Sequence, residues 1–165
     1  MNNDPNANYP INLGKLISNL HSLEVSIRTF LFIKNIGLDS SKEHAQSLRN
    51  LKVGQSVTEN HFTDYDTLKT LIKIYNKEVS KFDSELIVDE TIVGLRDALA
   101  HGRVFSFEPF SPMILLKFSK PNSGNTIVEF MAIMTTEWFD KQIKRVHNEF
   151  GKVLKASNQI STGNN

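Results

Sequence analysis

An arginine, an aspartate and a histidine stand close together in the segment GLRDALAHGRV, residues 94–104. Arg96 carries a permanently charged fork of donors that suits phosphate, and His101 belongs to the residue type whose charge changes near neutral pH. A fixed cation beside a group that gives or takes a proton can serve the cleavage of a phosphodiester bond. Asp97 adds a carboxylate four residues before the histidine. The segment therefore indicates a site for chemistry on phosphate.

The segment is expected to form a helix with one apolar and one polar face. Apolar residues at three- and four-residue steps predict the inward face: Ile92, Leu95 and Leu99. Asp97 and His101, four residues apart, then share the opposite face. Gly94 and Ala98 are expected beside them, where small side chains would let a second helix approach closely. That helix could come from another copy of the chain, so we predict a dimer interface at Gly94 and Ala98.

A simpler interpretation of the same residues stays open. Asp97 and His101 could form a surface pair at i,i+4 spacing, and Arg96 could pair with a nearby carboxylate. His101 followed by Gly102 could simply end the helix. Spacing alone favours this interpretation, because periodicity does not distinguish a site from a solvated face.

The motif resembles the R-x-x-x-x-H signature of the HEPN superfamily, the "higher eukaryotes and prokaryotes nucleotide-binding" domains. Arg96, Asp97 and His101 match its arginine, its polar position and its histidine, and Ala100 and Gly102 flank the histidine as in many members. The resemblance implies a metal-independent endoribonuclease of the toxin or phage-defence type. It also implies that Arg96 binds the scissile phosphate, that His101 transfers protons, and that dimers line one cleft with two motif helices.

Other interpretations remain beside the ribonuclease. Asp97 stands where many members have asparagine, and its carboxylate could orient His101 or repel RNA. Some members of the superfamily are non-catalytic modules for nucleotide or RNA binding or for assembly, and a purely structural charge cluster is a third alternative. Arg103 and Arg28 are further candidates for substrate binding. The implied partners are RNA, a second copy of the chain and an antitoxin protein.

A mainly α fold, a HEPN-like bundle of four to five helices, is expected to position the motif. Apolar residues recur with the helical period in 11–36, 38–51 and 65–82, in the motif segment, and after a cap at Thr135 or Thr136. Asp39 or Ser40 is the expected cap of the second helix. Strand-like runs on either side of the turn sequence PNSGN predict a β-hairpin insertion at about 104–133, before the last helix, with room for a third strand.

Length and composition predict one globular domain. The chain has 165 residues, of which 39% are hydrophobic and 22% charged, values that are ordinary for a folded protein. The expected domain covers 11–157, with disordered ends at 1–10 and 158–165. The net charge of +1 excludes a strongly basic coat for nucleic acid but not a local basic patch.

Several classes of site are excluded or not expected. The absence of cysteine rules out disulfides, thiolate metal sites and a cysteine nucleophile. The histidines lack the short spacings of a zinc site, and no glycine-rich phosphate loop occurs, so we expect neither metal nor cofactor. The N-terminus does not resemble a signal peptide, and no apolar run approaches the roughly 20 residues of a membrane span. We therefore expect a cytoplasmic protein without a membrane partner.

Overall fold

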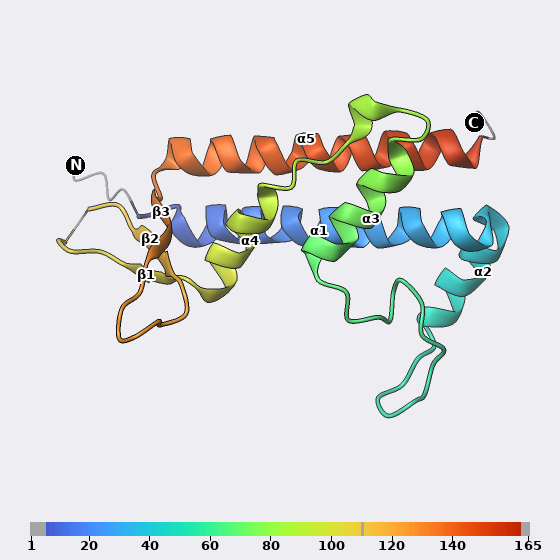
Figure 1. Cartoon of the computed structure of the whole chain (residues 1–165), viewed down its shortest axis with the longest axis horizontal. Helices are drawn as coiled ribbons and strands as arrows, with labels where there is room; N and C mark the ends of the chain where they lie inside the picture. The colour runs from blue at the N-terminus through green and yellow to red at the C-terminus, as the bar shows by residue number, and fades with distance from the viewer. Residues whose placement is uncertain (1–5, 110, 163–165) are drawn as a thin grey trace. The chain divides into compact units, whose positions relative to one another are not determined.

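The computed structural model describes residues 6–109 and 111–162. Its elements follow one another as α1 (Tyr9–Ile36), α2 (Leu38–Leu48), α3 (Leu68–Val79), the 3-10 turn η1 (Ser84–Leu86), α4 (Ile92–His101), β1 (Arg103–Phe105), β2 (Ile114–Phe118), β3 (Val128–Ile133) and α5 (Thr136–Ser161) (Figure 1). The described part is thus mainly helical, with five α-helices and a small antiparallel sheet before the last one. The mainly α class is confirmed.

The contacts of the chain divide it into two compact units. The motif unit comprises Met1–Leu20 and Thr91–His147, and the loop unit comprises His21–Glu90 and Asn148–Asn165. Helices α1 and α5 each contribute one part to either unit. The motif helix α4 and the whole sheet belong to the motif unit. The expected single domain over 11–157 stays a prediction.

The boundary between α1 and α2 depends on a glycine. Gly37 has φ 82°, a left-handed conformation that a side chain would disfavour, and its position allows the chain to turn at once from one helix into the next. Helix α2 therefore begins at Leu38, and no side chain caps it. The expected cap at Asp39 or Ser40 is wrong, because both residues lie inside the first turn.

Threonines cap two of the other helices. The Thr67 hydroxyl accepts a hydrogen bond from the backbone N–H of Thr70, 3.3 Å away, at the start of α3. The Thr135 hydroxyl accepts one from the N–H of Trp138, 3.2 Å away, and starts α5. Each bond satisfies a donor that the first turn of a helix leaves without a partner. The predicted cap at Thr135 is confirmed.

The three strands form an antiparallel sheet in the order β1-β2-β3. Arg103 pairs with Leu116, and Leu116 pairs in turn with Met131. The PNSGN sequence makes the turn between β2 and β3, with a bridge between Asn122 and Asn125. The predicted insertion and its third strand are confirmed.

The core of the motif unit lies where α4 packs against β2 and β3, and along the parts of α1 and α5 that belong to this unit. Fully or nearly fully buried side chains supply it: Leu16, Leu20, Ile92, Leu95, Ala98, Leu115, Met134, Phe139 and Val146. Phe139 belongs to the apolar stripe of α5. Its burial makes it a core residue of this unit.

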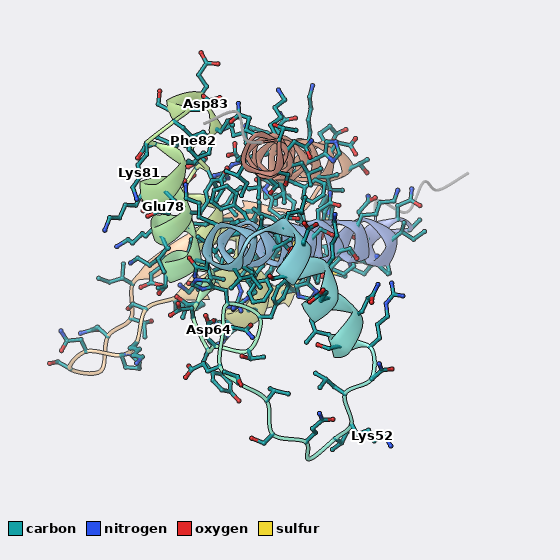
Figure 2. The ribbon with its side chains drawn as sticks, turned by 90° about the vertical axis from the view of Figure 1, so that its right-hand side faces the viewer. Lys52, Asp64, Glu78, Lys81, Phe82 and Asp83 are labelled. Atoms are coloured by element: carbon teal, nitrogen blue, oxygen red, sulfur yellow. The ribbon has the colours of Figure 1, made fainter. Side chains whose placement is uncertain are left out.

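The core of the loop unit is built around α3, which buries Leu68, Leu71, Ile72, Tyr75 and Val79. The ring of Tyr75 packs edge-on against Phe30, with centroids 4.9 Å apart. Where α3 ends, Glu78 and Lys81 form an ion pair at 2.6 Å, and Phe82 follows directly (Figure 2). The ammonium of Lys34 lies 5.4 Å from the centre of the Phe82 ring.

The first helix begins earlier, and the last helix ends later, than the sequence indicates. Helix α1 begins at Tyr9, whose ring packs edge-on against Phe139 at 5.9 Å, and α5 continues to Ser161, where Gln159 donates to Asp83 at 3.1 Å. Residues 9–10 and 158–161, which we expected in the disordered ends, are helical in the structure. Residues 1–5 and 163–165 lie outside the described residues.

No helix in the described ranges has both the length and the apolar character to cross a membrane.

Candidate functional site

The motif helix α4 ends because Gly102 leaves the helical conformation. Its ψ of 171° is extended, and its N–H donates to the carbonyl of Ala98 at 2.7 Å. A Cβ at this position would lie 2.6 Å from a methyl group of Leu115 and closer still to the Ala98 carbonyl oxygen. Only glycine therefore fits where the end of α4 meets β2. This contact fixes the end of the helix, and with it the backbone of His101, against the sheet.

Helix α4 buries a face that differs from the predicted one. Ile92 and Leu95 are buried as expected, but Leu99 is only half-buried and Ala98 is fully buried. Positions 92, 95 and 98 span about 120° of the helix circumference, so the buried face is wider than predicted and extends to Ala98. The interface predicted at Ala98 is wrong, because Ala98 lies in the core of its own chain. Gly94 is exposed, with open space around it.

Arg96 and Asp97 pair with each other on the surface of α4. Their charged atoms are 3.4 Å apart, and the two side chains are 43% and 36% exposed. Within the described ranges, no hydrogen bond or ion pair joins either of them to His101. The pairing of Arg96 with a nearby carboxylate is confirmed, whereas the expected surface pair of Asp97 with His101 is wrong.

The carboxylate of Asp97 also acts on the sheet beneath α4. Lys117 on β2 pairs with Glu129 at 2.9 Å, and this hydrogen bond, together with the charges of Glu129 and Asp97, raises the pKa of Lys117. Lys117 is thus already paired with Glu129, and Arg96 is the cation that pairs with Asp97 itself. This reduces the repulsion of an anionic ligand that the aspartate would otherwise cause.

His101 lies in a surface hollow of about 190 Å³ on the motif unit. The hollow is lined by His101, Arg103, Phe118, Ser119, Pro121 and Thr126. The imidazole has no hydrogen-bond or ion-pair partner among the described residues. The structure thus brings together two of the predicted site residues, His101 and Arg103. Arg96 does not line the hollow.

Arg28 belongs to the loop unit and is a structural residue. Its guanidinium donates to Glu24, to the Asp64 carboxylate at 2.6 Å, and to the backbone carbonyls of His61 and Asp66. These bonds use all five N–H donors of the side chain, which is 12% exposed. Arg28 therefore has no donor left for the substrate binding that we predicted, and Glu24, four residues before it, is one of its ion-pair partners.

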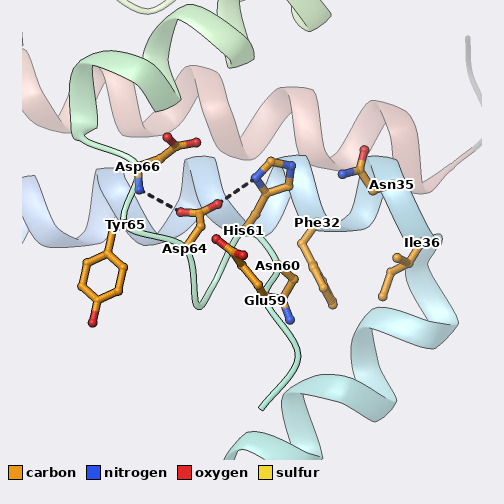
Figure 3. A pocket seen from close by; sticks show the side chains of 9 residues that line it. All are labelled: Phe32, Asn35, Ile36, Glu59, Asn60, His61, Asp64, Tyr65 and Asp66. Atoms are coloured by element: carbon orange, nitrogen blue, oxygen red, sulfur yellow. Dashed lines mark hydrogen bonds and ion pairs between the residues drawn. The ribbon is translucent and has the colours of Figure 1, made fainter. Parts of the chain in front are cut away.

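The loop held by Arg28 borders a second hollow, of about 750 Å³, which lies wholly in the loop unit (Figure 3). Its lining comes from α1 and from the loop before α3: Phe32, Asn35, Ile36, Glu59, Asn60, His61, Asp64, Tyr65 and Asp66. Nδ1 of His61 lies 3.3 Å from the Asp64 carboxylate. Sequence reasoning missed this hollow, although the segment HFTDYD, 61–66, gathers a histidine and two aspartates. No group of three metal-binding side chains occurs in the part of the chain that the structure describes.

Comparisons with protein-family models, with curated proteins and with solved structures find no match for this chain.

Proposed function

We propose that the chain is a metal-independent endoribonuclease of the toxin or phage-defence type, built on a HEPN-like bundle. The observation that carries the proposal is the hollow that His101 shares with Arg103. It combines an imidazole that has no partner among the described residues with a permanently charged guanidinium. These groups supply proton transfer and phosphate binding at the end of the helix that carries the R-x-x-x-x-H sequence.

The reaction proposed for this site is transesterification of RNA. The 2′-oxygen attacks the adjacent phosphorus, and the bond from phosphorus to the 5′-oxygen of the next nucleotide breaks. The 2′-hydroxyl loses its proton to a base, and the departing 5′-oxygen gains one from an acid. The products are a 2′,3′-cyclic phosphate and a free 5′-hydroxyl. His101 acts as the acid or the base, a role that contributes roughly 10²–10⁴-fold to the rate.

A second copy of the chain completes the proposed site. On one helix the directions of Arg96 and His101 differ by about 140°, since they are five residues apart. In a two-fold dimer, the same face of α4 from both copies meets at the axis. Gly94 points within about 20° of His101 and about 160° from Arg96, so a contact at Gly94 brings the two histidines together and makes both available for the two proton transfers. Gly94 is the exposed small residue that permits this approach.

The proposal is tested by incubating the purified protein with mixed RNA in the presence of a chelator. We expect cleavage by the wild type and no cleavage by His101→Ala, with His21→Ala, an exposed histidine of the loop unit, as the matched control. DNA should remain intact because it lacks the 2′-hydroxyl. Equal cleavage by His101→Ala would refute the assignment, and activity that is lost in chelator and restored by Mg²⁺ or Mn²⁺ would refute the metal-free mechanism.

A non-catalytic module for nucleotide or RNA binding is the second candidate function. It is favoured by the ion pair between Arg96 and Asp97 and by the absence of Arg96 from the lining of the hollow. Under this alternative the wild type binds RNA and leaves it uncut. Binding of an RNA by the wild type without any cleavage, over the same protein concentrations, would decide for the module.

A further inference from the structure

We infer that the hollow beside His101 is a subsite for one unpaired nucleobase of an RNA strand. The inference rests on the proposed function for the position of the scissile phosphate. It goes beyond that function by assigning base binding to β1, to β2 and to the loop that follows β2. Arg103, Phe118 and Thr126 are the residues that would bind the base.

Arg103 and Phe118 provide two planar surfaces on the same side of the sheet. Arg103 pairs with Leu116, so Phe118, two residues further along β2, projects from the same face. The guanidinium carbon of Arg103 lies over the phenyl ring, 5.4 Å from its centre, so a base reaches this ring face when the exposed Arg103 side chain swings aside. Phe118 is half-buried and lines the hollow, while Arg103 is exposed. A base can stack on an aromatic ring or on a guanidinium plane, whatever its sequence.

The wall of the hollow is already held in shape. The backbone N–H of Ser119 donates to the carbonyl of Ile127 at 2.8 Å, and the N–H of Ile127 donates back to the Ser119 hydroxyl at 3.0 Å. These two bonds close the loop between β2 and β3 at its base. Binding a base would therefore cost little ordering of the loop. The hydroxyl of Thr126 has no partner among the described residues, and it can bond to the edge of a base or to a ribose.

The charges of the hollow favour an anionic strand. Arg103 carries a permanent positive charge, and His101 can carry one, whereas no carboxylate occurs among the described residues that line the hollow. A phosphate next to the stacked base would lie beside these two side chains. The base would then set the position of the phosphodiester bond relative to His101.

This arrangement distinguishes a single strand from a duplex. In a double helix the bases are stacked on each other and paired, so none can lay its face on Phe118. In a single strand one base can turn outward at low cost. The subsite thus selects unpaired RNA and adds affinity through stacking, which is largely independent of base identity.

The test measures binding of a fluorescent single-stranded RNA that carries 2′-O-methyl groups and so cannot be cleaved. We expect Phe118→Leu to weaken binding at least about fivefold, the lower end of stacking energies for one base. Phe107→Leu is the matched control, because Phe107 is 78% exposed, packs edge-on against Phe105 and lies outside the hollow. A 2-aminopurine base in the strand should lose fluorescence on binding to the wild type, a readout that needs no variant.

Equal affinities of the two phenylalanine variants, an unquenched 2-aminopurine, or a duplex bound as tightly as the single strand would overturn the inference. Cleavage of ordinary RNA is measured in parallel to separate the two proposals. Binding that depends on Phe118 without any cleavage refutes the ribonuclease and leaves the base subsite. Cleavage with an affinity that Phe118→Leu leaves unchanged refutes the subsite and leaves the ribonuclease.

Discussion

Gly102 is the residue that sets the position of the motif histidine. It follows His101 directly, and the contacts that it makes with Ala98 and Leu115 leave no room for a Cβ. Its φ of −75° is accessible to any residue, so the requirement for glycine comes from the close approach of α4 to β2 and not from backbone strain. A side chain here would push the end of the helix, and the imidazole with it, away from the sheet.

We therefore predict that Gly102→Ala lowers the free energy of unfolding by about 1–3 kcal/mol, the usual cost of overpacking. Urea unfolding followed by circular dichroism measures the change. Gly14→Ala is the matched control, since Gly14 lies in α1 with open space around it and alanine favours a helix by up to about 1 kcal/mol. A Gly102→Ala variant as stable as the wild type would show that the contact between α4 and β2 is looser than described.

Asp64 makes the stability of the loop unit depend on pH. Burial acts to raise the pKa of Asp64, but hydrogen bonds from Arg28, the backbone N–H of Asp66 and His61, together with the charge of Arg28, lower it below its usual value. A carboxyl whose pKa is lower in the folded state stabilises the fold above its unfolded pKa of about 3.9, and loses this contribution as the pH falls through the folded pKa.

We predict that Asp64→Asn destabilises the protein by about 1.5–3 kcal/mol at pH 7, the range for a hydrogen bond to a charged group. The difference between variant and wild type should shrink as the pH falls below about 4, because the wild-type carboxyl is then protonated as well. The midpoints of urea unfolding of both proteins, recorded between pH 2.5 and pH 7, measure this difference in stability. A difference that stays constant over this range would contradict the role of the ionised carboxylate.

At the scale of elements, the segment between η1 and α4 is held by side chains and not by a strand or helix of its own. The amide of Asn76 on α3 makes two bonds of 2.9 Å with the N–H and the carbonyl of Val88. The hydroxyl of Tyr75 donates to the carbonyl of Leu86 at 3.0 Å, and burial is the main cause of the raised pKa of this tyrosine. From α5, Glu149 accepts from the N–H of Asp89 at 3.0 Å.

Asn76→Ala should lower the free energy of unfolding by about 1–3 kcal/mol for each backbone group left without a partner in this half-buried place. The amide hydrogen of Val88 should also exchange faster with solvent, which hydrogen-exchange measurements resolve residue by residue. Asn35→Ala serves as the control, because Asn35 is exposed and has no hydrogen bond within the described part. Unchanged exchange at Val88 would mean that the segment does not need the asparagine.

At the scale of the whole molecule, the homodimer stays a prediction, and it now depends on Gly94 without Ala98. We predict that Gly94→Trp weakens both dimerisation and cleavage, because the bulky ring keeps the two α4 helices apart. Gly14→Trp is matched to it, since both are exposed helical glycines of the motif unit with open space around them. Light scattering at the concentrations of the cleavage assay measures the mass. A monomeric wild type that cleaves at full rate would refute the shared site.

The outer strand β3 offers a second surface through which two copies could associate. The variant Met131→Lys distinguishes a dimer formed through β3 from one formed through α4. Met131 and Ile133 are 63% and 52% exposed on this edge strand, and unprotected edges invite pairing. If the copies meet through α4, Met131→Lys leaves the dimer intact. If Met131→Lys dissociates it while Gly94→Trp does not, the dimer forms through β3 and the shared motif site is refuted.

The sequence by itself determined the elements of this fold. The helical period of leucines predicted the helices, Thr135 marked the start of the last one, and the turn residues PNSGN separated two strands. These signals are local, since a cap or a turn needs only neighbouring residues and a periodic stripe needs only one element. The composition, without cysteine and with a net charge of +1, excluded thiolate sites and a basic coat in the same direct way.

Only the tertiary structure decided which of the candidate residues meet. Ala98 is buried because β2 packs under α4, and Arg28 is occupied because a loop more than thirty residues away folds onto it. His101 and Arg103 meet Phe118 because β2 returns along β1. Whether a side chain is buried, and whether its donors are used, depends on residues that are distant in the chain. No local sequence pattern shows which of these residues will lie next to it in the fold.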